Sequence, residues 1–457
     1  MSHIKSINPF DNQVNAEILL HSNEELDNKL QTANEVFKTW SNTGFEYRAS
    51  FFEKLSKLLI TKQEELAKWI TIEMGKPISE AKAEILKCTT VCDYYAKNAE
   101  TILADEYFDI ENQLSYVKYQ PLGVILAVMP WNFPFWQVFR FAAPTLMAGN
   151  VGVLKHASNV PLCAQAIEDL FHEAGFPFGV FTNVYVAGNE VDNLIKNQII
   201  KAVTLTGSEK AGASVASVAG ANIKKSVLEL GGNDAFIVLE DADLEKAVEI
   251  AAKSRLQNAG QSCIAAKRFL VQDAVYKFFK EKLIAKIEEL VKLGNPLDEK
   301  VTFGPLARVD LANEVRNQIK KSVAQGAKLA YGNIEKENEN ALVLPVILEE
   351  IPSDSVAYNV EIFGPVFSLF KFDYIHEAID LANDSEYGLG GSVWTSNLEM
   401  GQLIAASIET GAVFVNSFVK SDTRLPFGGV KKSGFGREMS ELGIKEFVNA
   451  KTVVVVG

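Results

Sequence analysis

One cysteine, Cys263, lies in a stretch of small and amide-bearing residues that reads Asn258-Ala259-Gly260-Gln261-Ser262-Cys263-Ile264-Ala265-Ala266. Small neighbours allow a reacting group to approach the sulfur closely. The apolar run at 269–271 predicts a buried strand that holds this loop in place. A partly ionised thiol in such a loop is a candidate nucleophile, whereas a cysteine without partners is more often an inert core residue. Three further stretches favour the first interpretation.

These stretches are Pro130-Trp131-Asn132-Phe133-Pro134, Glu229-Leu230-Gly231-Gly232 and Glu361-Ile362-Phe363-Gly364-Pro365. Together with the cysteine loop, and in this order along the chain, they resemble the motifs of the aldehyde dehydrogenase superfamily. The resemblance extends from Asn8 to Glu438 and so covers nearly the whole chain. It implies an enzyme that oxidises a small-molecule aldehyde with a nicotinamide cofactor.

The composition fits a globular enzyme of one to three domains, with 457 residues of which 47% are hydrophobic. A net charge of −13 argues against nucleic acid or an anionic membrane as a partner. No apolar run reaches the roughly 20 residues of a membrane span, and the N-terminal residues lack the apolar core of a signal peptide. Four cysteines do not make a disulfide scaffold, so a cytoplasmic location is expected. Cys88 and Cys92 lack a nearby histidine, so no metal site is expected.

Apolar spacings of three and four predict helices over 23–103, and the alternating pattern at 107–121 predicts an exposed hairpin or arm. From Gly123 onward short apolar strands alternate with helices. The first block has strands at 124–128, 151–154, 184–186 and 203–205, with helices at 135–148, 160–173 and 208–219. The second block has strands at 235–239, 269–271, 366–370, 391–394 and 412–415. Such alternation predicts parallel βαβ units in doubly wound α/β sheets, whose ligands lie beyond the carboxyl ends of the strands.

The resemblance implies two doubly wound parallel-sheet domains with a small oligomerisation arm. On this basis we expect residues 1–111 and 124–230 to form the dinucleotide-binding domain and residues 231–430 the catalytic domain that carries the cysteine. Residues 112–123 and 440–457 are expected to form the arm, and the assembly to be a homodimer or a homotetramer.

The usual Gly-x-Gly-x-x-Gly fingerprint is missing after the first parallel strand. Gly207 and Ser208 are the best substitute, because a strand ends at Thr206, the glycine permits close approach and Ser208 can cap the next helix. The helix N-terminus then offers free N–H groups to a phosphate. An ordinary capped helix has the same pattern, and the similarity to the family's variant dinucleotide loop favours the cofactor interpretation.

A second cofactor segment, Lys155-His156-Ala157-Ser158, follows the strand at 151–154. Lys155 can reach a ribose hydroxyl or a phosphate, although a solvated loop lysine is the alternative. NAD-preferring members of the family typically carry a glutamate where this chain has Ser158. A carboxylate there would repel a 2′-phosphate, so serine favours NADP, with NAD still possible. The resemblance further implies cofactor contacts from Trp131, Leu230, Glu361 and Phe363, with Glu361 at the nicotinamide ribose.

The chemistry implied is covalent catalysis by Cys263, whose sulfur adds to the aldehyde and gives a thiohemiacetal and then a thioester. Asn132 supplies a side-chain amide to the oxyanion, beside the backbone N–H of Cys263. Glu229 ends an apolar strand next to a Gly-Gly turn, where a raised pKa suits a general base that activates water. The alternative is that Glu229 is an ordinary solvated carboxylate at the end of a strand.

Trp136 and Arg140 lie four apart and share a helix face near Asn132, and arginine binds carboxylates in bidentate fashion. The loop at 416–429, with Ser421, resembles that of the succinate-semialdehyde branch of the family, as does the lack of a glutamate at Ser158. Succinate semialdehyde is therefore the expected substrate, although Arg140 could equally pair with a protein acid. A broad-specificity aliphatic aldehyde dehydrogenase is the alternative. A non-enzymatic member would be expected to lose the nucleophile or the base, and both are present.

Overall fold

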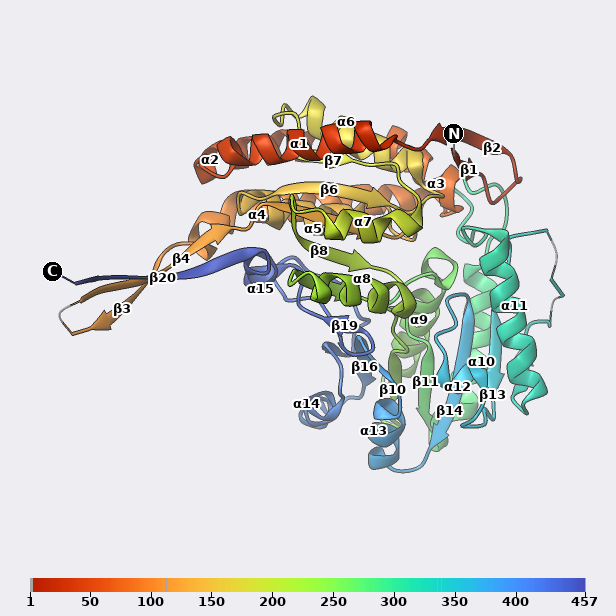
Figure 1. Ribbon diagram of the computed structural model, residues 1–457. Coiled ribbons are helices and arrows are strands. Elements are labelled where there is room, and N and C mark those ends of the chain that lie inside the picture. Colours follow the sequence, from red (N-terminus) through yellow and green to blue (C-terminus); the bar gives the residue numbers. More distant parts are fainter. Residues whose placement is uncertain (1–2, 112, 335, 338, 457) are drawn as a thin grey trace.

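The computed structural model describes residues 3–111, 113–334, 336–337 and 339–456 (Figure 1). Asn112, the first residue expected in the arm, lies outside this part of the chain, as do Met1, Ser2, Glu335, Asn338 and Gly457. Two layered bodies, each built on a mostly parallel sheet, lie against each other, and a thin three-stranded arm projects from one of them. The α/β class with two parallel-sheet bodies and an arm is thus confirmed.

The chain begins with a hairpin of β1 (His3–Ile7) and β2 (Val14–Leu19), which the sequence did not indicate. The helices expected over 23–103 are α1 (Asn23–Trp40), α2 (Phe45–Thr61), α3 (Gln63–Met74) and α4 (Ile78–Ile102). A capping box of Ser22 and Glu25 fixes the start of α1. Gly75 ends α3 in the left-handed region, with φ of 79°.

The first sheet has the order β19-β9-β8-β5-β6-β7. Its strands are β5 (Val124–Met129), β6 (Val151–His156), β7 (Phe181–Asn183), β8 (Ile200–Thr206), β9 (Lys225–Glu229) and the antiparallel β19 (Gly434–Phe435). The accompanying helices are α5 (Trp136–Met147), α6 (Pro161–Glu173), η1 (Gly188–Glu190), α7 (Val191–Lys196) and α8 (Glu209–Ala221). The order reverses next to β5, which places the ends of β5 and β8 at a switch point where ligands bind.

The strand expected at 184–186 is wrong, because β7 ends at Asn183. The backbone of Tyr185 bonds the segment before α1 instead of the sheet. Its N–H donates to His21 Nδ1 at 3.1 Å and its carbonyl accepts from the His21 N–H at 2.9 Å. Val184 and Val186 are nevertheless buried. Their apolar character therefore predicted a strand at a segment that is buried without being one.

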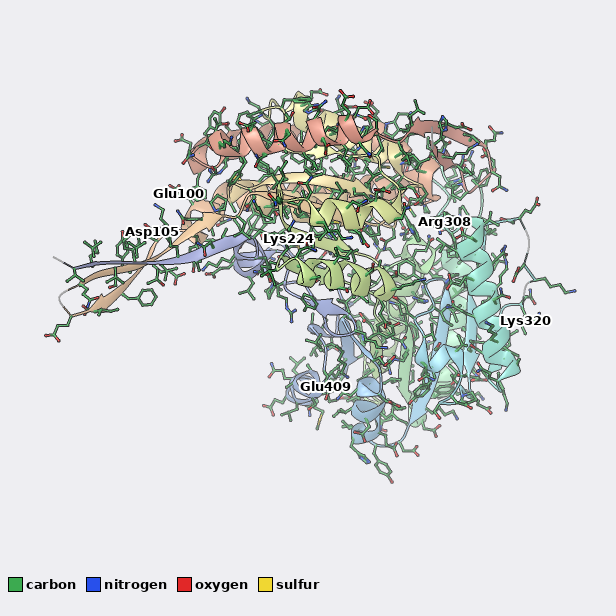
Figure 2. All side chains as sticks on the ribbon, viewed as in Figure 1. Glu100, Asp105, Lys224, Arg308, Lys320 and Glu409 are labelled. Carbon is green, nitrogen blue, oxygen red and sulfur yellow. The ribbon has the colours of Figure 1, made fainter. Side chains whose placement is uncertain are left out.

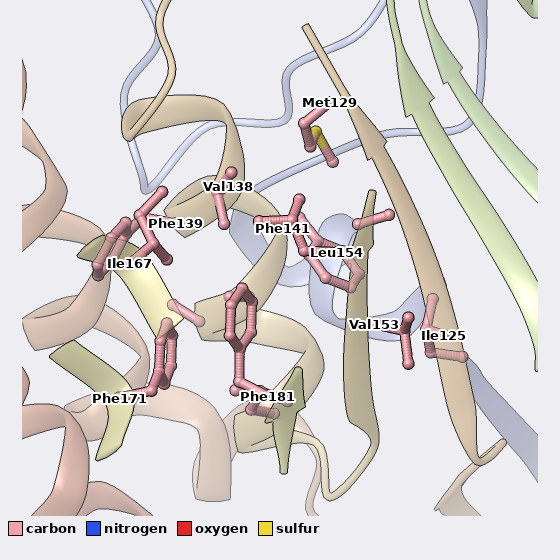
Figure 3. Packing of buried hydrophobic residues seen from close by; sticks show 14 of the residues in the cluster. Ile125, Met129, Val138, Phe139, Phe141, Val153, Leu154, Ile167, Phe171 and Phe181 are labelled. Carbon is pink, nitrogen blue, oxygen red and sulfur yellow. The ribbon is translucent and has the colours of Figure 1, made fainter. Parts of the chain in front are cut away.

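Aromatic packing fixes α5 and α6 on one face of this sheet (Figure 3). The rings of Phe171 and Phe181 stack with centroids 4.2 Å apart, and Phe139 stacks on Phe171 at 5.8 Å. Burial of each large aromatic ring contributes on the order of 1.5–3 kcal/mol. The helix that follows the Trp131-Asn132 turn is therefore held rigidly over the sheet.

The second sheet has the order β12-β13-β14-β11-β10-β16-β17. The five predicted strands are present as β10 (Ala235–Val238), β11 (Arg268–Gln272), β14 (Val366–Phe372), β16 (Gly390–Trp394) and β17 (Ala412–Val415). Two edge strands were missed, β12 (Lys328–Tyr331) and β13 (Val346–Glu349). The flanking helices are α9 (Leu244–Leu256), η2 (Gln257–Gly260), α10 (Asp273–Leu290), α11 (Val309–Ala324), α12 (Val356–Asn359), α13 (Ile375–Asn383) and α14 (Leu398–Ser407).

The arm is the antiparallel sheet β20-β4-β3, formed by β3 (Glu106–Ile110), β4 (Gln113–Pro121) and β20 (Val448–Val456). The hairpin expected at 107–121 and the pairing of the terminal valines with it are confirmed. Asp105, labelled in Figure 2, marks the base of the arm, and side chains project from both faces of its outer part. β15 (Tyr387–Gly388) and β18 (Val430–Lys431) form a two-stranded antiparallel sheet, and α15 (Ser440–Lys445) precedes β20 of the arm.

Candidate active site

Residues from both bodies line one cavity of about 280 Å³ at the carboxyl ends of β5 and β8. Cys263 and the loop at Gly207 and Ser208, far apart in sequence, both face it. The lining includes Trp131, Asn132, Gly207, Ser208, Leu230, Cys263, Glu361 and Phe363, all of them predicted site residues. The indole of Trp131 meets the ring of Phe363 edge-on with centroids 6.0 Å apart, so the two rings together give the cavity an aromatic lining.

The loop before the cysteine has an unusual backbone. Asn258, Ala259 and Gly260 are all in the left-handed region, with φ of 53°, 51° and 79°. The conformation costs roughly 1–2 kcal/mol for each residue with a side chain. A Cβ on Gly260 would lie 2.4 Å from the carbonyl oxygen of Gly364, so only glycine fits there. The carboxylate of Glu80 on α4 accepts the Asn258 N–H at 2.8 Å and stabilises this turn.

The Cys263 thiol at the end of this loop is half-buried. Burial raises its pKa to about 12, while the positive charges of Arg140 and Lys267 act in the opposite direction. The sulfur is therefore protonated at neutral pH in this state of the protein. Nucleophilic attack requires that a base or an approaching positive charge favour the thiolate.

Lys267 supports the cysteine loop from beneath. Its ammonium donates to the carbonyl oxygens of Cys263 at 2.7 Å and of Ser262 and Ala265 at 3.1 Å each. The same ammonium forms an ion pair with Glu361 at 3.2 Å. One buried cation thus fixes the position of the sulfur relative to the carboxylate expected at the nicotinamide ribose.

The side chain of Asn132 is buried and oriented by two amides. Its Nδ2 donates to the carbonyl oxygen of Gln261 at 3.1 Å, and its Oδ1 accepts from Gln137 Nε2 at 3.1 Å. An amide nitrogen carries two N–H groups, so the second is available to an oxyanion in the cavity. Asn258 Nδ2 also donates to the Asn132 carbonyl oxygen at 2.8 Å, which ties the turn to the cysteine loop.

The turn that carries Asn132 is anchored by Glu84 of α4. One carboxylate oxygen accepts the N–H groups of Phe135 and Trp136, at 2.9 and 3.0 Å, at the positive end of α5. The other oxygen forms a buried ion pair with Lys76, whose ammonium lies 3.9 Å from the centroid of the Phe133 ring.

Glu229 lies at the end of β9 with its carboxylate buried, and neither oxygen is hydrogen-bonded within the described residues. Burial raises its pKa well above the usual range, and the negative charge of Glu438 raises it further. Arg140 and Arg437 partly offset this effect. The negative charge of Glu229 in turn helps to raise the pKa of the Cys263 thiol. A buried carboxylate with a raised pKa is suited to general-base catalysis.

The loop at Gly207 and Ser208, predicted to bind the cofactor, has the expected shape. Ser208 Oγ accepts the Ala211 N–H at 3.3 Å and caps α8, and the loop faces the cavity. Lys155 at the end of β6 is half-buried, which lowers its pKa, and within the described residues it pairs with no carboxylate. Ser158 is exposed beyond it. A capped helix N-terminus, an unpaired lysine and a hydroxyl in place of a carboxylate fit a dinucleotide with a 2′-phosphate.

His156 and its neighbour Ala157 complete that segment. The imidazole is buried, and burial lowers its pKa to about 4, so the ring is neutral. Its Nε2 lies 2.9 Å from the Pro134 carbonyl oxygen, and its Nδ1 accepts the Ala157 N–H at 2.9 Å. The ring therefore holds the Asn132 turn against β6 rather than pointing into the cavity.

The three expected substrate residues have different surroundings. Arg140 forms a buried ion pair with Glu438, which is the alternative that the sequence left open. Its Nη2 also donates to Thr206 Oγ1 at 3.4 Å, and its guanidinium lies over the Phe427 ring. Trp136 and Ser421 instead meet at Lys87 of α4. The Lys87 ammonium donates to Ser421 Oγ at 2.6 Å and lies 4.3 Å from the centroid of the Trp136 ring.

Sequence reasoning missed Glu80, Glu84 and Lys87, which all serve the site from α4. They are spaced four and three apart and so share a face of the helix. The same face carries the buried Ile85 and Cys88. Charged residues on the apolar face of a helix are the signal that would have identified them.

The described residues contain no group of three or more His, Cys, Asp and Glu placed to hold a metal ion. None of their helices is long and apolar enough to cross a bilayer.

Comparison with known proteins gives the family. A sequence model of the aldehyde dehydrogenase family matches residues 1–453. The chain belongs to the aldehyde dehydrogenase family. It is 49% identical to a probable NADP(+) succinate-semialdehyde dehydrogenase of Synechocystis sp., over 98% of this chain and 99% of that protein. It is 44% identical to an NAD(P)+ succinate semialdehyde dehydrogenase of Escherichia coli, over 99% of this chain and 98% of that protein.

Solved structures agree with this assignment of the fold. The succinic semialdehyde dehydrogenase of Streptococcus pyogenes, crystallised with NADP+, superimposes with a TM-score of 0.96 at 40% identity, over 99% of this chain and all of that one. Gox0499, whose structure was analysed for cofactor and substrate selection, gives a TM-score of 0.97 at 41% identity, over 99% of each chain.

Proposed function

We propose that this aldehyde dehydrogenase oxidises succinate semialdehyde to succinate with NADP as the preferred cofactor. The observation that carries the proposal is that one cavity is lined both by Cys263 with Asn132 and by the cofactor loop at Gly207 and Ser208. Oxidation of an aldehyde held on the sulfur requires the hydride acceptor to lie beside it. The names of the relatives favour the four-carbon substrate and the phosphorylated cofactor.

The reaction begins when the Cys263 sulfur, having lost its proton, forms a bond to the aldehyde carbon. The carbonyl π electrons move to the oxygen, and that oxyanion accepts hydrogen bonds from the second N–H of Asn132 and from the Cys263 backbone N–H. NADP, when bound, supplies the acceptor for the hydride that leaves the same carbon. Loss of hydride restores the carbonyl and gives a thioester on Cys263.

Hydrolysis of the thioester uses Glu229. Its carboxylate takes a proton from water while the water oxygen adds to the acyl carbon, and the C–S bond then breaks to release succinate and the thiolate. Because Glu229 is buried with no protein donor on its oxygens within the described residues, its carboxylate is free to accept the water proton.

Cofactor binding is assigned to both sides of the switch point. Lys155 and Ser158 receive the adenosine ribose and its 2′-phosphate, and the α8 N-terminus receives the pyrophosphate. Trp131, Leu230 and Phe363 contact the nicotinamide half, with Glu361 at its ribose. His156 and Ala157 shape the segment through the bond between the ring and the backbone. NAD is the second candidate cofactor.

Substrate contacts are assigned to Trp136 and Ser421, with Arg140 adding positive potential while it stays paired with Glu438. A broad-specificity aliphatic aldehyde dehydrogenase is the second candidate, because the aromatic walls of the cavity also suit neutral aldehydes. The exposed apolar residues Tyr107, Phe108 and Val454 on the arm favour a homodimer or homotetramer joined through it. Four free cysteines agree with a reducing cytoplasmic location.

Initial rates with a panel of aldehydes test this proposal, measured with NADP and with NAD. We expect the highest kcat/KM for succinate semialdehyde with NADP, above those for butanal and other neutral aldehydes. Equal kcat/KM values for succinate semialdehyde and butanal would contradict this proposal and support the broad-specificity aliphatic function instead. A Cys263→Ala variant, tested in parallel, should have no activity with either aldehyde.

A further inference from the structure

Lys87 is a cation in an unusual position. It lies on α4, half-buried, with its ammonium bonded to Ser421 Oγ at 2.6 Å and stacked against the Trp136 ring at 4.3 Å. Its charge interacts electrostatically with Arg140 and with the Cys263 thiol. Three segments that are distant in the chain therefore converge on one ammonium group, whose charge interacts with the Cys263 thiol.

The charge of Lys87 is not neutralised by the protein. Within the described residues no aspartate or glutamate forms an ion pair with it. Glu84, one turn earlier on α4, is committed to Lys76 and to the N–H groups at the start of α5. Arg140 by contrast already has a buried carboxylate partner in Glu438. Of the three cations whose charges act on the Cys263 thiol, Arg140 and Lys267 pair with Glu438 and Glu361. Within the described residues, Lys87 is the one without a carboxylate partner, so its charge is available to a ligand.

Partial burial of an unpaired ammonium has an energetic cost, because the group loses hydration without gaining an opposite charge. Contact with the indole face recovers only about 0.5–2 kcal/mol. An anionic ligand group removes the remaining penalty. An ammonium has three N–H donors, and the one used by Ser421 leaves donors for such a group.

We propose that Lys87 is the residue that recognises the terminal carboxylate of the substrate, with Ser421 as its hydroxyl partner. The inference rests on the proposed function and deepens it, because it names the group that would separate a carboxylate-bearing aldehyde from a neutral one. Bound at Lys87, the carboxylate holds the far end of the chain while the aldehyde carbon meets Cys263. Binding energy from this remote contact then lowers the barrier at the reacting carbon.

The test compares Lys87→Gln with the wild-type holoenzyme, using kcat/KM for succinate semialdehyde and for butanal in each protein. Loss of a charge-assisted hydrogen bond predicts that the ratio of the two kcat/KM values falls on the order of 10- to 100-fold. Lys87→Arg keeps the positive charge and should retain most of the ratio. Lys97→Gln removes a charge from the exposed face of the same helix and is the matched control, with an unchanged ratio.

The outcomes separate this inference from the proposed function. A wild-type enzyme with no preference for succinate semialdehyde overturns the proposed function. A wild-type preference that persists in Lys87→Gln overturns the role of Lys87 alone. If Lys87→Gln does not fold, inhibition of the wild-type holoenzyme by succinate and by butyramide across pH 7 to 9.5 replaces it. Succinate inhibition that weakens as the lysine loses its proton supports the inference, and inhibition that stays constant overturns it.

Discussion

The guanidinium of Arg140 forms an ion pair with the carboxylate of Glu438, with side chains only 3% and 5% exposed. The pair lies beside Glu229, whose pKa Glu438 raises and Arg140 lowers. The ion pair therefore has two consequences. It removes Arg140 from the cations free to bind a substrate anion, and it sets the electrostatic environment of Glu229, the proposed general base.

Removal of one partner of this pair should be strongly destabilising. Arg140→Met leaves the Glu438 carboxylate buried without its cation, and broken buried pairs cost about 3–5 kcal/mol of unfolding free energy. Urea denaturation measures the loss. The double variant Arg140→Met/Glu438→Leu leaves no charge behind and should recover most of the stability. A single variant as stable as the wild type would show that the pair makes no net contribution.

Glu229→Gln should separate the two halves of the reaction. The glutamine cannot accept a proton from water, so the thioester accumulates after hydride transfer. We expect one equivalent of NADPH per active site in a rapid burst, followed by a turnover rate about 100-fold or more below that of the wild type. Stopped-flow absorbance at the NADPH band measures both phases. If the folded, NADP-binding variant gave no burst, Glu229 would act before hydride transfer, for example by deprotonating Cys263.

Ser158→Glu should reverse the cofactor preference. The new carboxylate lies where the 2′-phosphate is expected, and two like charges at that distance weaken NADP binding by at least about tenfold while NAD keeps its ribose hydroxyl contact. Dissociation constants for both cofactors, measured by protein fluorescence, report the change. Ser158→Gln introduces a side chain of the same size as glutamate but without its charge, and is the control. Equal weakening of NADP and NAD by glutamate would place Ser158 away from the phosphate.

Most of the fold could be predicted from the local hydrophobic pattern of the sequence. Helices over 23–103, the two blocks of parallel strands and the arm all have strong periodicity, and their packing follows from it. The failure at 184–186 has a non-local cause, because the Tyr185 backbone bonds to His21, 164 residues away. The edge strand β12, with the burial pattern of one exposed and three half-buried residues, lacks the apolar run that marks the central strands.

The candidate site also divides into residues that the sequence predicts and residues that only the structure identifies. Cys263, Asn132, Glu229 and Glu361 stand in motifs, and the structure brings Cys263, Asn132 and Glu361 to one cavity. The residues that support them, such as Glu80, Glu84 and Lys267, act through the protein backbone, and no sequence spacing specifies which carbonyl or N–H they meet. The structure was also needed to tell Arg140 from Lys87 as the cation available to a substrate carboxylate. Arg140 pairs with Glu438, and Lys87 pairs with no carboxylate within the described residues.

The pH dependence of substrate preference follows from Lys87. Burial lowers its pKa to about 8 from the usual 10.5, with Arg140 lowering it further and Cys88, Glu84 and Cys263 acting in the opposite direction. Below pH 8 the ammonium is charged and binds the substrate carboxylate, which is ionised throughout this range. Above pH 8 the neutral amine offers no charge, so kcat/KM for succinate semialdehyde should fall by up to about tenfold per pH unit.

Butanal provides the internal control for this profile. Titration of Cys263 or Glu229 alters the chemistry of both aldehydes and cancels in the ratio of their kcat/KM values, whereas Lys87 acts only on the carboxylate. The ratio should therefore be constant from pH 6.5 to 7.5 and decline above pH 8. In Lys87→Arg the guanidinium stays charged to pH 10, so its ratio should not decline. A wild-type ratio that stays flat to pH 9.5 would contradict carboxylate recognition by Lys87, because the loss of its proton would then have no effect on the substrate that carries the charge.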